Sequence, residues 1–281
     1  MPMQSHHLVA YFSPAGSTRL VAETIRLRLA HHGHAATMID LGKRNVPLRE
    51  KLAPLVGKPC CLWIGSPVYC DHAVPVVSDF LAGLPSGLGG HGVAFVTWGG
   101  VTSGLALPEL AQQLRAKGFI PVAAAKVLAV HSSLWQSPRP LGMGHPNGGD
   151  LALVERMVEA VVNNLANGSV QPLAQSALEY LSPALRADAA GKSLALAKAS
   201  MPPLAADEQR CSRCGECALA CPVAAIVLDP FPRIGAACVV CMQCVRVCPE
   251  EAFPYNAQAV AERIAAMAAR SDEAKETAVF Y

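Results

Sequence analysis

Eight cysteines between positions 211 and 248 constrain this chain of 281 residues more than any other feature. They form two runs that share the spacing C-x2-C-x2-C-x3-C-P, and the second run begins 27 residues after the first. The first run contains Cys211, Cys214, Cys217 and Cys221, and the second contains Cys238, Cys241, Cys244 and Cys248. Such crowding indicates one shared purpose, which can be a disulfide framework, a zinc site or iron–sulfur ligation.

The start of the chain and the cysteine spacing separate these three uses. A signal peptide has a cationic segment, then an apolar run, then a cleavage site of small residues, and the first residues of this chain do not show that order. We therefore expect no signal peptide and a cytoplasmic location. In that reducing compartment cysteines are more often ligands than disulfide partners. Structural zinc sites use two C-x2-C pairs with a longer gap between them, whereas here each run is a single crowded group. The pattern therefore predicts two [4Fe–4S] clusters.

The double run resembles that of bacterial two-cluster ferredoxins, in which the fourth cysteine of each run binds the other cluster. The resemblance implies a first cluster held by Cys211, Cys214, Cys217 and Cys248, and a second held by Cys238, Cys241, Cys244 and Cys221. Two such clusters form a one-electron relay. We expect a small α+β ferredoxin domain at 207–256, followed by a C-terminal helix and tail at 257–281 that could dock back.

Residues 1–168 alternate between short apolar runs and helical patterns. Strands are expected at 7–13, 35–40, 59–66, 92–99 and 121–130, and helices at 18–33, 73–84, 105–118 and 150–168. This alternation predicts an α/β domain with a doubly wound, five-stranded parallel sheet, in which ligands bind beyond the carboxyl ends of the strands. Residues 169–206 mix Pro, Ala and Ser with helical fragments, so we expect a partly helical linker that ends at 201–203.

A loop that can hold phosphate joins the first strand to the first helix. It comprises Ser13, Pro14, Ala15, Gly16, Ser17 and Thr18. The N-terminus of a helix offers free N–H groups, and the hydroxyls of this loop add further donors. No lysine is present, so this is not a Walker loop. The alternative is an ordinary helix cap with nothing bound, and the loop alone does not choose between the two.

Two further loops leave the carboxyl ends of the third and fourth expected strands. They contribute Pro67, Val68 and Tyr69, and Thr97, Trp98, Gly99 and Gly100. Aromatic rings beside a cleft suit a flat aromatic ligand, although each ring could instead pack on its own loop. Cys70 follows Tyr69 and could touch such a ligand. The connection at 131–150 is long, and it could cover the ligand, dock a partner or be an ordinary surface loop.

The order of these three loops resembles that of a flavodoxin, with a departure at Ala15, where a hydroxyl is expected. The resemblance implies FMN, with its phosphate on the first loop and its ring between Tyr69 and Trp98. It also implies that backbone groups of the glycines bond the ring. With the double cysteine run, the whole chain resembles a bacterial and archaeal family that fuses an N-terminal flavodoxin-like domain to a C-terminal two-cluster ferredoxin.

The resemblance implies an electron-transfer protein that couples two-electron FMN to the clusters and serves redox partner proteins. One alternative is a reductase of a quinone or other small molecule, fed by its own clusters, with His72 or His145 as the acid. Another is a ferredoxin carried on a flavin-free docking domain, which Ala15 keeps open. A net charge of +2 gives no field for nucleic acid, and the apolar stretches are too short for a membrane span.

Overall fold

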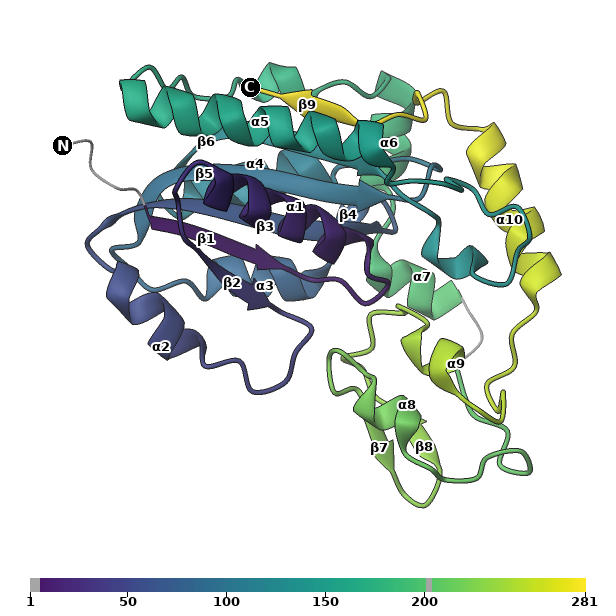
Figure 1. The fold of residues 1–281 in the computed structure, drawn as a ribbon. Coiled ribbons are helices and arrows are strands. Elements are labelled where there is room, and N and C mark those ends of the chain that lie inside the picture. Colours follow the sequence, from purple (N-terminus) through teal and green to yellow (C-terminus); the bar gives the residue numbers. More distant parts are fainter. Residues whose placement is uncertain (1–5, 201–203) are drawn as a thin grey trace.

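The computed structural model describes residues 6–200 and 204–281, so the expected end of the linker at 201–203 lies outside the described residues. Figure 1 shows a large domain around a central sheet and, below it, a small cysteine-rich part. The five parallel strands lie in the order β2 (Ala36–Asp40), β1 (His6–Tyr11), β3 (Pro59–Tyr69), β5 (Gly89–Trp98) and β6 (Phe119–Leu128). The predicted α/β sheet is confirmed, and this order is the flavodoxin-like one.

Helices cover both faces of this sheet because its strands are apolar on both sides. One face carries α1 (Ser17–His31) and α5 (Gly148–Asn167), and the other carries α3 (Pro75–Ala82) and α4 (Ala106–Ala116). Successive strand residues point to opposite faces, so Leu8 packs with the second pair of helices and Val9 with the first. Parallel strands buried in this way need apolar residues at nearly every position.

Two short strands extend the sheet beyond the expected five. The strand β4 (His72–Ala73) pairs antiparallel with the end of β3 and closes a tight hairpin. The strand β9 (Ala278–Phe280) pairs antiparallel with β6 and covers the edge of the sheet. An uncovered edge strand exposes unpaired backbone groups, so β9 completes the sheet as well as extending it. The central sheet therefore uses both ends of the chain.

The cysteine-rich part has its own small core between the two runs. Its elements are α8 (Glu216–Leu219), the hairpin of β7 (Ile226–Leu228) and β8 (Pro232–Ile234), and α9 (Gln243–Val247). The segment before it contains α6 (Pro183–Ala190) and α7 (Leu194–Ser200), and α2 (Leu48–Leu52) follows β2. Within the described residues, no helix is both long enough and apolar enough to cross a membrane.

The chain returns from the cysteine-rich part to the large domain through α10 (Ala257–Ala269) and the residues after it. We call residues 271–281 the C-terminal strap. The hydroxyl of Thr277 in this strap donates to Asp150 Oδ1 at 2.6 Å and accepts from the backbone N–H of Leu128 at 3.0 Å. Together with β9, these buried bonds fix the end of the chain to the large domain.

The long connection at 131–150 also holds the two parts together. The ring of Trp135 stacks on Tyr255 with 4.3 Å between centroids, and the Tyr255 hydroxyl donates to the Ser133 carbonyl. In the loop after β2, the Arg44 guanidinium donates to the Ala218 carbonyl. The cysteine-rich part is thus anchored at separate points on the large domain.

Candidate functional site

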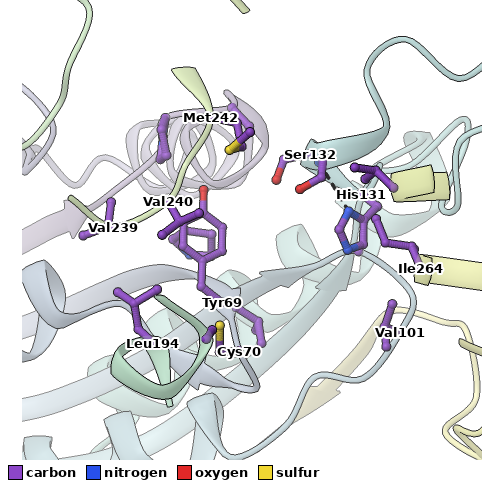
Figure 2. Close-up of a pocket in the computed structure, with 18 of the residues that line it drawn as sticks. Tyr69, Cys70, Val101, His131, Ser132, Leu194, Val239, Val240, Met242 and Ile264 are labelled. Atoms are coloured by element: carbon purple, nitrogen blue, oxygen red, sulfur yellow. Dashed lines mark hydrogen bonds between the residues drawn. The ribbon is translucent and has the colours of Figure 1, made fainter. Parts of the chain in front are cut away.

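A cavity of about 1870 Å³ lies between the carboxyl ends of the parallel strands and the second part of the chain. One wall consists of the loops after β1, β3, β5 and β6. The opposite wall consists of α7, the loop of the second cysteine run and α10. Figure 2 shows residues of both walls around this space, with Val240 beside the ring of Tyr69, Ile264 beside His131, and Met242 nearby. The cavity therefore lies where a doubly wound sheet binds its ligands.

The first strand-end loop is shaped as a helix start that faces the cavity. Five of its six predicted site residues line the cavity: Ser13, Pro14, Ala15, Ser17 and Thr18. Gly16 caps α1 in the left-handed conformation, with φ at 97°, and has no side chain with which to cap the helix itself. Two hydroxyls are already engaged: Ser13 Oγ accepts from the Arg19 N–H at 2.9 Å, and Thr18 Oγ1 lies 2.7 Å from Thr97 Oγ1. The Arg19 N–H is thus already bonded, so the backbone N–H groups that precede it in the first turn are the donors that this loop can offer an anion.

Tyr69 stands at the centre of the cavity wall. It is the last residue of β3, which runs past the expected end so that Pro67 and Val68 also belong to the strand. Its hydroxyl is buried and has no hydrogen-bond partner among the described residues. Burial, together with the nearby Cys241, raises the pKa of this phenol, and the Ser132 side chain close to it opposes the rise. A buried hydroxyl without a partner is costly, so this group is suited to a ligand that completes it.

Trp98, expected as the second flanking ring, is among the residues that line the cavity, but its ring is almost fully covered. It is the last residue of β5, and its side chain points to the sheet face opposite that of Thr97. Only 1% of its surface is exposed, and the ammonium groups of Lys126 and Lys275 lie 5.0 and 5.8 Å from its ring centroid. A ring already covered in this way has no free face for stacking.

Neighbouring side chains leave little room for a Cβ at the two glycines after Trp98. A Cβ at Gly99 would lie 2.7 Å from His131 Cδ2, and one at Gly100 would lie 3.0 Å from Leu141 Cγ. Gly99 lines the cavity, whereas Gly100 is not among the described lining residues. A glycine at position 99 therefore allows the loop after β6 to pack closely against it.

His131 is a cavity residue that the sequence reasoning missed. Its Nδ1 accepts a hydrogen bond from the Ser133 N–H at 3.3 Å. Burial, with a smaller contribution from Arg263, lowers the pKa of His131 to about 4, so the imidazole is neutral at physiological pH. Its position in the sequence could have indicated it, because His131 follows the last parallel strand and so lies at the same edge of the sheet as the other three loops.

The two histidines named as acid candidates lie elsewhere. His72 Nδ1 is 2.7 Å from Glu109 Oε1, and its Nε2 lies 3.0 Å from the Ala189 carbonyl. His145 Nδ1 is 2.6 Å from Asp150 Oδ2. Neither histidine is among the described lining residues, whereas Cys70 is. The structure therefore does not bring these imidazoles to the cavity.

The two cysteine runs adopt the same backbone conformation. Three left-handed residues in the first half recur 27 positions later in the second half: Arg213 and Val240, Gly215 and Met242, and Ala224 and Glu251. The hydrogen bonds to sulfur recur in the same way, from the Ala225 N–H to Cys221 Sγ at 3.2 Å and from the Ala252 N–H to Cys248 Sγ at 3.3 Å. A left-handed valine is strained, so its presence indicates that the loop shape is imposed.

The thiols gather into two groups that cross between the runs. The pKa of Cys217 is raised by burial and by the thiols of Cys211, Cys214 and Cys248, which are therefore its neighbours. Burial raises the pKa of Cys244 to about 12, with further contributions from Cys241, Cys238 and Cys221. Each group thus combines three cysteines of one run with the fourth cysteine of the other.

Among the described residues, no three His, Cys, Asp or Glu side chains converge closely enough to hold a single metal ion. Four cysteines around a cuboid cluster bind four different irons, so they surround a volume instead of meeting at a point. The second group borders the cavity, because Cys238, Val239, Val240 and Met242 line it. The first group lies away from the cavity, and its Cys214 is exposed to solvent.

Comparisons with known proteins support parts of this description. Residues 205–227 match the Fer4 family, a 4Fe-4S binding domain, and this range contains all four cysteines of the first run. No curated protein matches the chain.

Several solved structures resemble the sheet domain. A rubredoxin oxygen:oxidoreductase from Desulfovibrio gigas is 20% identical over 58% of this chain and 37% of its own length, with a TM-score of 0.44. A flavodoxin from the domain Archaea is 19% identical over 57% of this chain and 98% of its own, with a TM-score of 0.44. The apo form of an NADH:FMN oxidoreductase is 18% identical over 65% and 94%, with a TM-score of 0.40. The chain thus spans little more than a third of the first of these structures.

Proposed function

We propose that this chain is an electron-transfer protein in which FMN, bound at the strand ends, exchanges electrons with two [4Fe–4S] clusters held by the cysteine runs. One observation carries the proposal: the loop of the second run forms a wall of the same cavity as the strand-end loops. A cofactor on those loops and a cluster in that run would face each other across the cavity, without an intervening domain movement.

The residues of the cavity fit FMN. The first-turn N–H groups of α1 and the Ser17 hydroxyl would receive the phosphate, so Ala15 removes one hydroxyl without removing the anion site. The ring of Tyr69 would pack on the flavin, and its orphaned hydroxyl would gain a partner. When bound, FMN supplies a group that takes up two electrons together or singly. Trp98 stays a structural residue in this proposal, since it is already covered.

The cysteine groups fit two cuboid clusters. The first would be held by Cys211, Cys214, Cys217 and Cys248, and the second by Cys238, Cys241, Cys244 and Cys221. The N–H groups of Ala225 and Ala252 would bond ligand sulfurs at equivalent places in the two sites. Hydrogen bonds to sulfur and solvent exposure both tune the reduction potential of such clusters.

The chain's own residues set the order of the relay. Tyr69 and Cys241 are neighbours, so the second run lies next to the cavity. The exposed Cys214 places the first run at the protein surface, where a redox partner protein can approach. Electrons would therefore pass between the cavity and a partner through the second run and then the first. Cysteine ligands in this number suit a reducing compartment, which we propose is the cytoplasm.

The test is the cofactor content of the chain purified without oxygen. We expect about eight irons per chain with matching sulfide, and one flavin that is released as FMN. Cys217→Ser should lower the iron content by about half, as should Cys244→Ser, whereas Cys60→Ala, outside both runs, should leave it unchanged. About four irons in the unchanged chain would overturn the two-cluster proposal, and absence of flavin after incubation with FMN would leave a ferredoxin on a flavin-free docking domain.

A further inference from the structure

The cavity is larger than one flavin site requires. Ordinary small-molecule pockets measure about 300–1,000 Å³, whereas this cavity measures about 1870 Å³. The strand-end loops occupy only one side of it. The space bordered by α7 and α10 lies on the other side, beyond the loops that the proposed function gives to FMN.

The lining of this second region is apolar and uncovered. Leu196 on α7 is 60% exposed and Met267 on α10 is 40% exposed, and both line the cavity. Leu194, Val240 and Val260 continue the same surface. Apolar side chains that converge on a cavity from separate elements typically mark a site for an apolar ligand.

Two cations that line the cavity, Lys198 and Arg263, lack an acidic partner among the described lining residues. Asp71 is the only carboxylate among the described lining residues, and its Oδ2 accepts from Lys192 Nζ at 2.6 Å. Lys198 Nζ donates to the carbonyls of Ala236 and Cys238. Arg263 therefore remains as a group that donates several hydrogen bonds and accepts none, so its complement is an oxygen acceptor.

Arg263 also marks the border between the two regions of the cavity. It extends from α10, and its charge adds to the lowering by burial of the pKa of His131 and opposes the rise that burial gives the pKa of Cys70, and both residues lie on the strand-end side. A ligand that packs on Leu196 and Met267 would thus bring its oxygens toward Arg263 and one edge toward the flavin position.

We propose that the region bordered by α7 and α10 is a second binding compartment, for a small flat apolar molecule with carbonyl oxygens, of the quinone class. Arg263 binds a carbonyl oxygen, and Leu196, Met267 and Val240 pack on the ring. This inference rests on the proposed function for the position of the flavin, and it concerns binding alone.

The test measures binding of menadione to the oxidised, FMN-loaded chain by equilibrium dialysis. We expect one menadione per chain, with FMN retained. Leu196→Trp should weaken binding about tenfold or more by filling the compartment, whereas Leu27→Trp should have no effect, because Leu27 is similarly exposed but lies on α1 outside the cavity. Arg263→Gln should weaken binding about tenfold, and Arg270→Gln, at the C-terminal cap of the same helix and outside the cavity lining, is its control.

Three results would overturn the inference. Menadione could fail to bind below about 1 mM, bind equally to Leu196→Trp and Leu27→Trp, or release FMN and so occupy the flavin position. Flavin and iron content of the same samples separate this failure from failure of the proposed function. If the chain takes up no FMN, the same pair of tryptophan variants still decides the compartment on the flavin-free protein.

Discussion

The ammonium of Lys126 lies 2.7 Å from the carboxylate of Glu273, and the two side chains are 5% and 3% exposed. Lys126 belongs to β6 in the large domain, whereas Glu273 belongs to the C-terminal strap, 147 positions later. The same carboxylate accepts from the backbone N–H and the hydroxyl of Ser103. A buried ion pair completed by hydrogen bonds therefore ties the strap to the sheet.

Removing one partner of this pair should destabilise the protein strongly. Glu273→Ala leaves the Lys126 ammonium buried without a counter-charge, and such a change typically costs about 3–5 kcal/mol. Urea unfolding followed by circular dichroism measures the loss. Glu276→Ala, at an exposed position of the same strap, should change the free energy of unfolding by less than about 0.5 kcal/mol. Equal effects of the two substitutions would contradict the role of the buried pair.

The hydroxyl of Thr277 should matter more than its methyl group. Thr277→Val removes the acceptor of the buried Leu128 N–H and the donor to Asp150, so we expect a loss of about 1–3 kcal/mol. Thr277→Ser keeps the hydroxyl and should retain most of the stability. Thermal or urea unfolding compares the two variants, and a serine variant as unstable as the valine variant would show that packing, not hydrogen bonding, is what the position provides.

Stability should decrease as the pH falls, because the buried His7 and the half-buried His131 resist protonation. Burial lowers the pKa of both His7 and His131 from 6.5 to about 4. At a pH between about 4 and 6.5, these histidines bind protons in the unfolded chain but not in the folded one. The free energy of unfolding therefore decreases as the pH falls from about 6.5 to about 4. Each histidine contributes at most about 3 kcal/mol, and the half-buried His131 contributes less than His7.

His7→Gln tests the larger part of this effect. The glutamine can still accept from Trp63 Nε1, which donates to His7 Nδ1 at 3.1 Å, but it does not titrate. Urea midpoints between pH 4 and 6.5 should vary less steeply in this variant than in the unchanged protein. An unchanged slope in His7→Gln would contradict the assignment.

Gly104 should tolerate no side chain, because it touches the hairpin that carries Tyr69. Its φ is +58°, and a Cβ there would lie 2.1 Å from the Asp71 carbonyl oxygen. Gly104→Ala should therefore cost well over the roughly 1 kcal/mol of a left-handed alanine and weaken FMN binding by moving Tyr69. Gly118 also has a positive φ, +82°, and a Cβ there would lie 4.0 Å from the Leu88 carbonyl oxygen, so Gly118→Ala should show the backbone penalty alone. Equal FMN affinities in the two variants would contradict the claim that Gly104 helps to position Tyr69.

The sequence predicted the features that depend on spacing and on long periodic segments. The five parallel strands are apolar runs separated by helices, so the sequence predicts that they exist and in which order they follow along the chain. The cysteine spacing predicts a tight loop in each run, because three of its four cysteines lie close together in the sequence. Tyr69 was found because the end of a parallel strand is a general binding position.

Other features depend on contacts that no local pattern encodes. A strand of three residues at 278–280 is too short for periodicity, and the partner of Lys126 is remote in the sequence. The burial of Trp98 depends on which face of β5 it occupies, and a shift of one residue reverses that choice. Arg263 and the apolar compartment require α7 and α10 to border one cavity, which only the docking of the two parts decides.

An anaerobic reductive titration of the purified chain, followed by visible absorbance, tests the central claim most directly. The account predicts four electrons per chain, two taken by one FMN and one by each of two clusters, with the flavin identified after release. Two electrons per chain, without flavin absorbance and with no flavin released, would contradict it. The cavity at the strand ends would then belong to a docking domain that carries a ferredoxin.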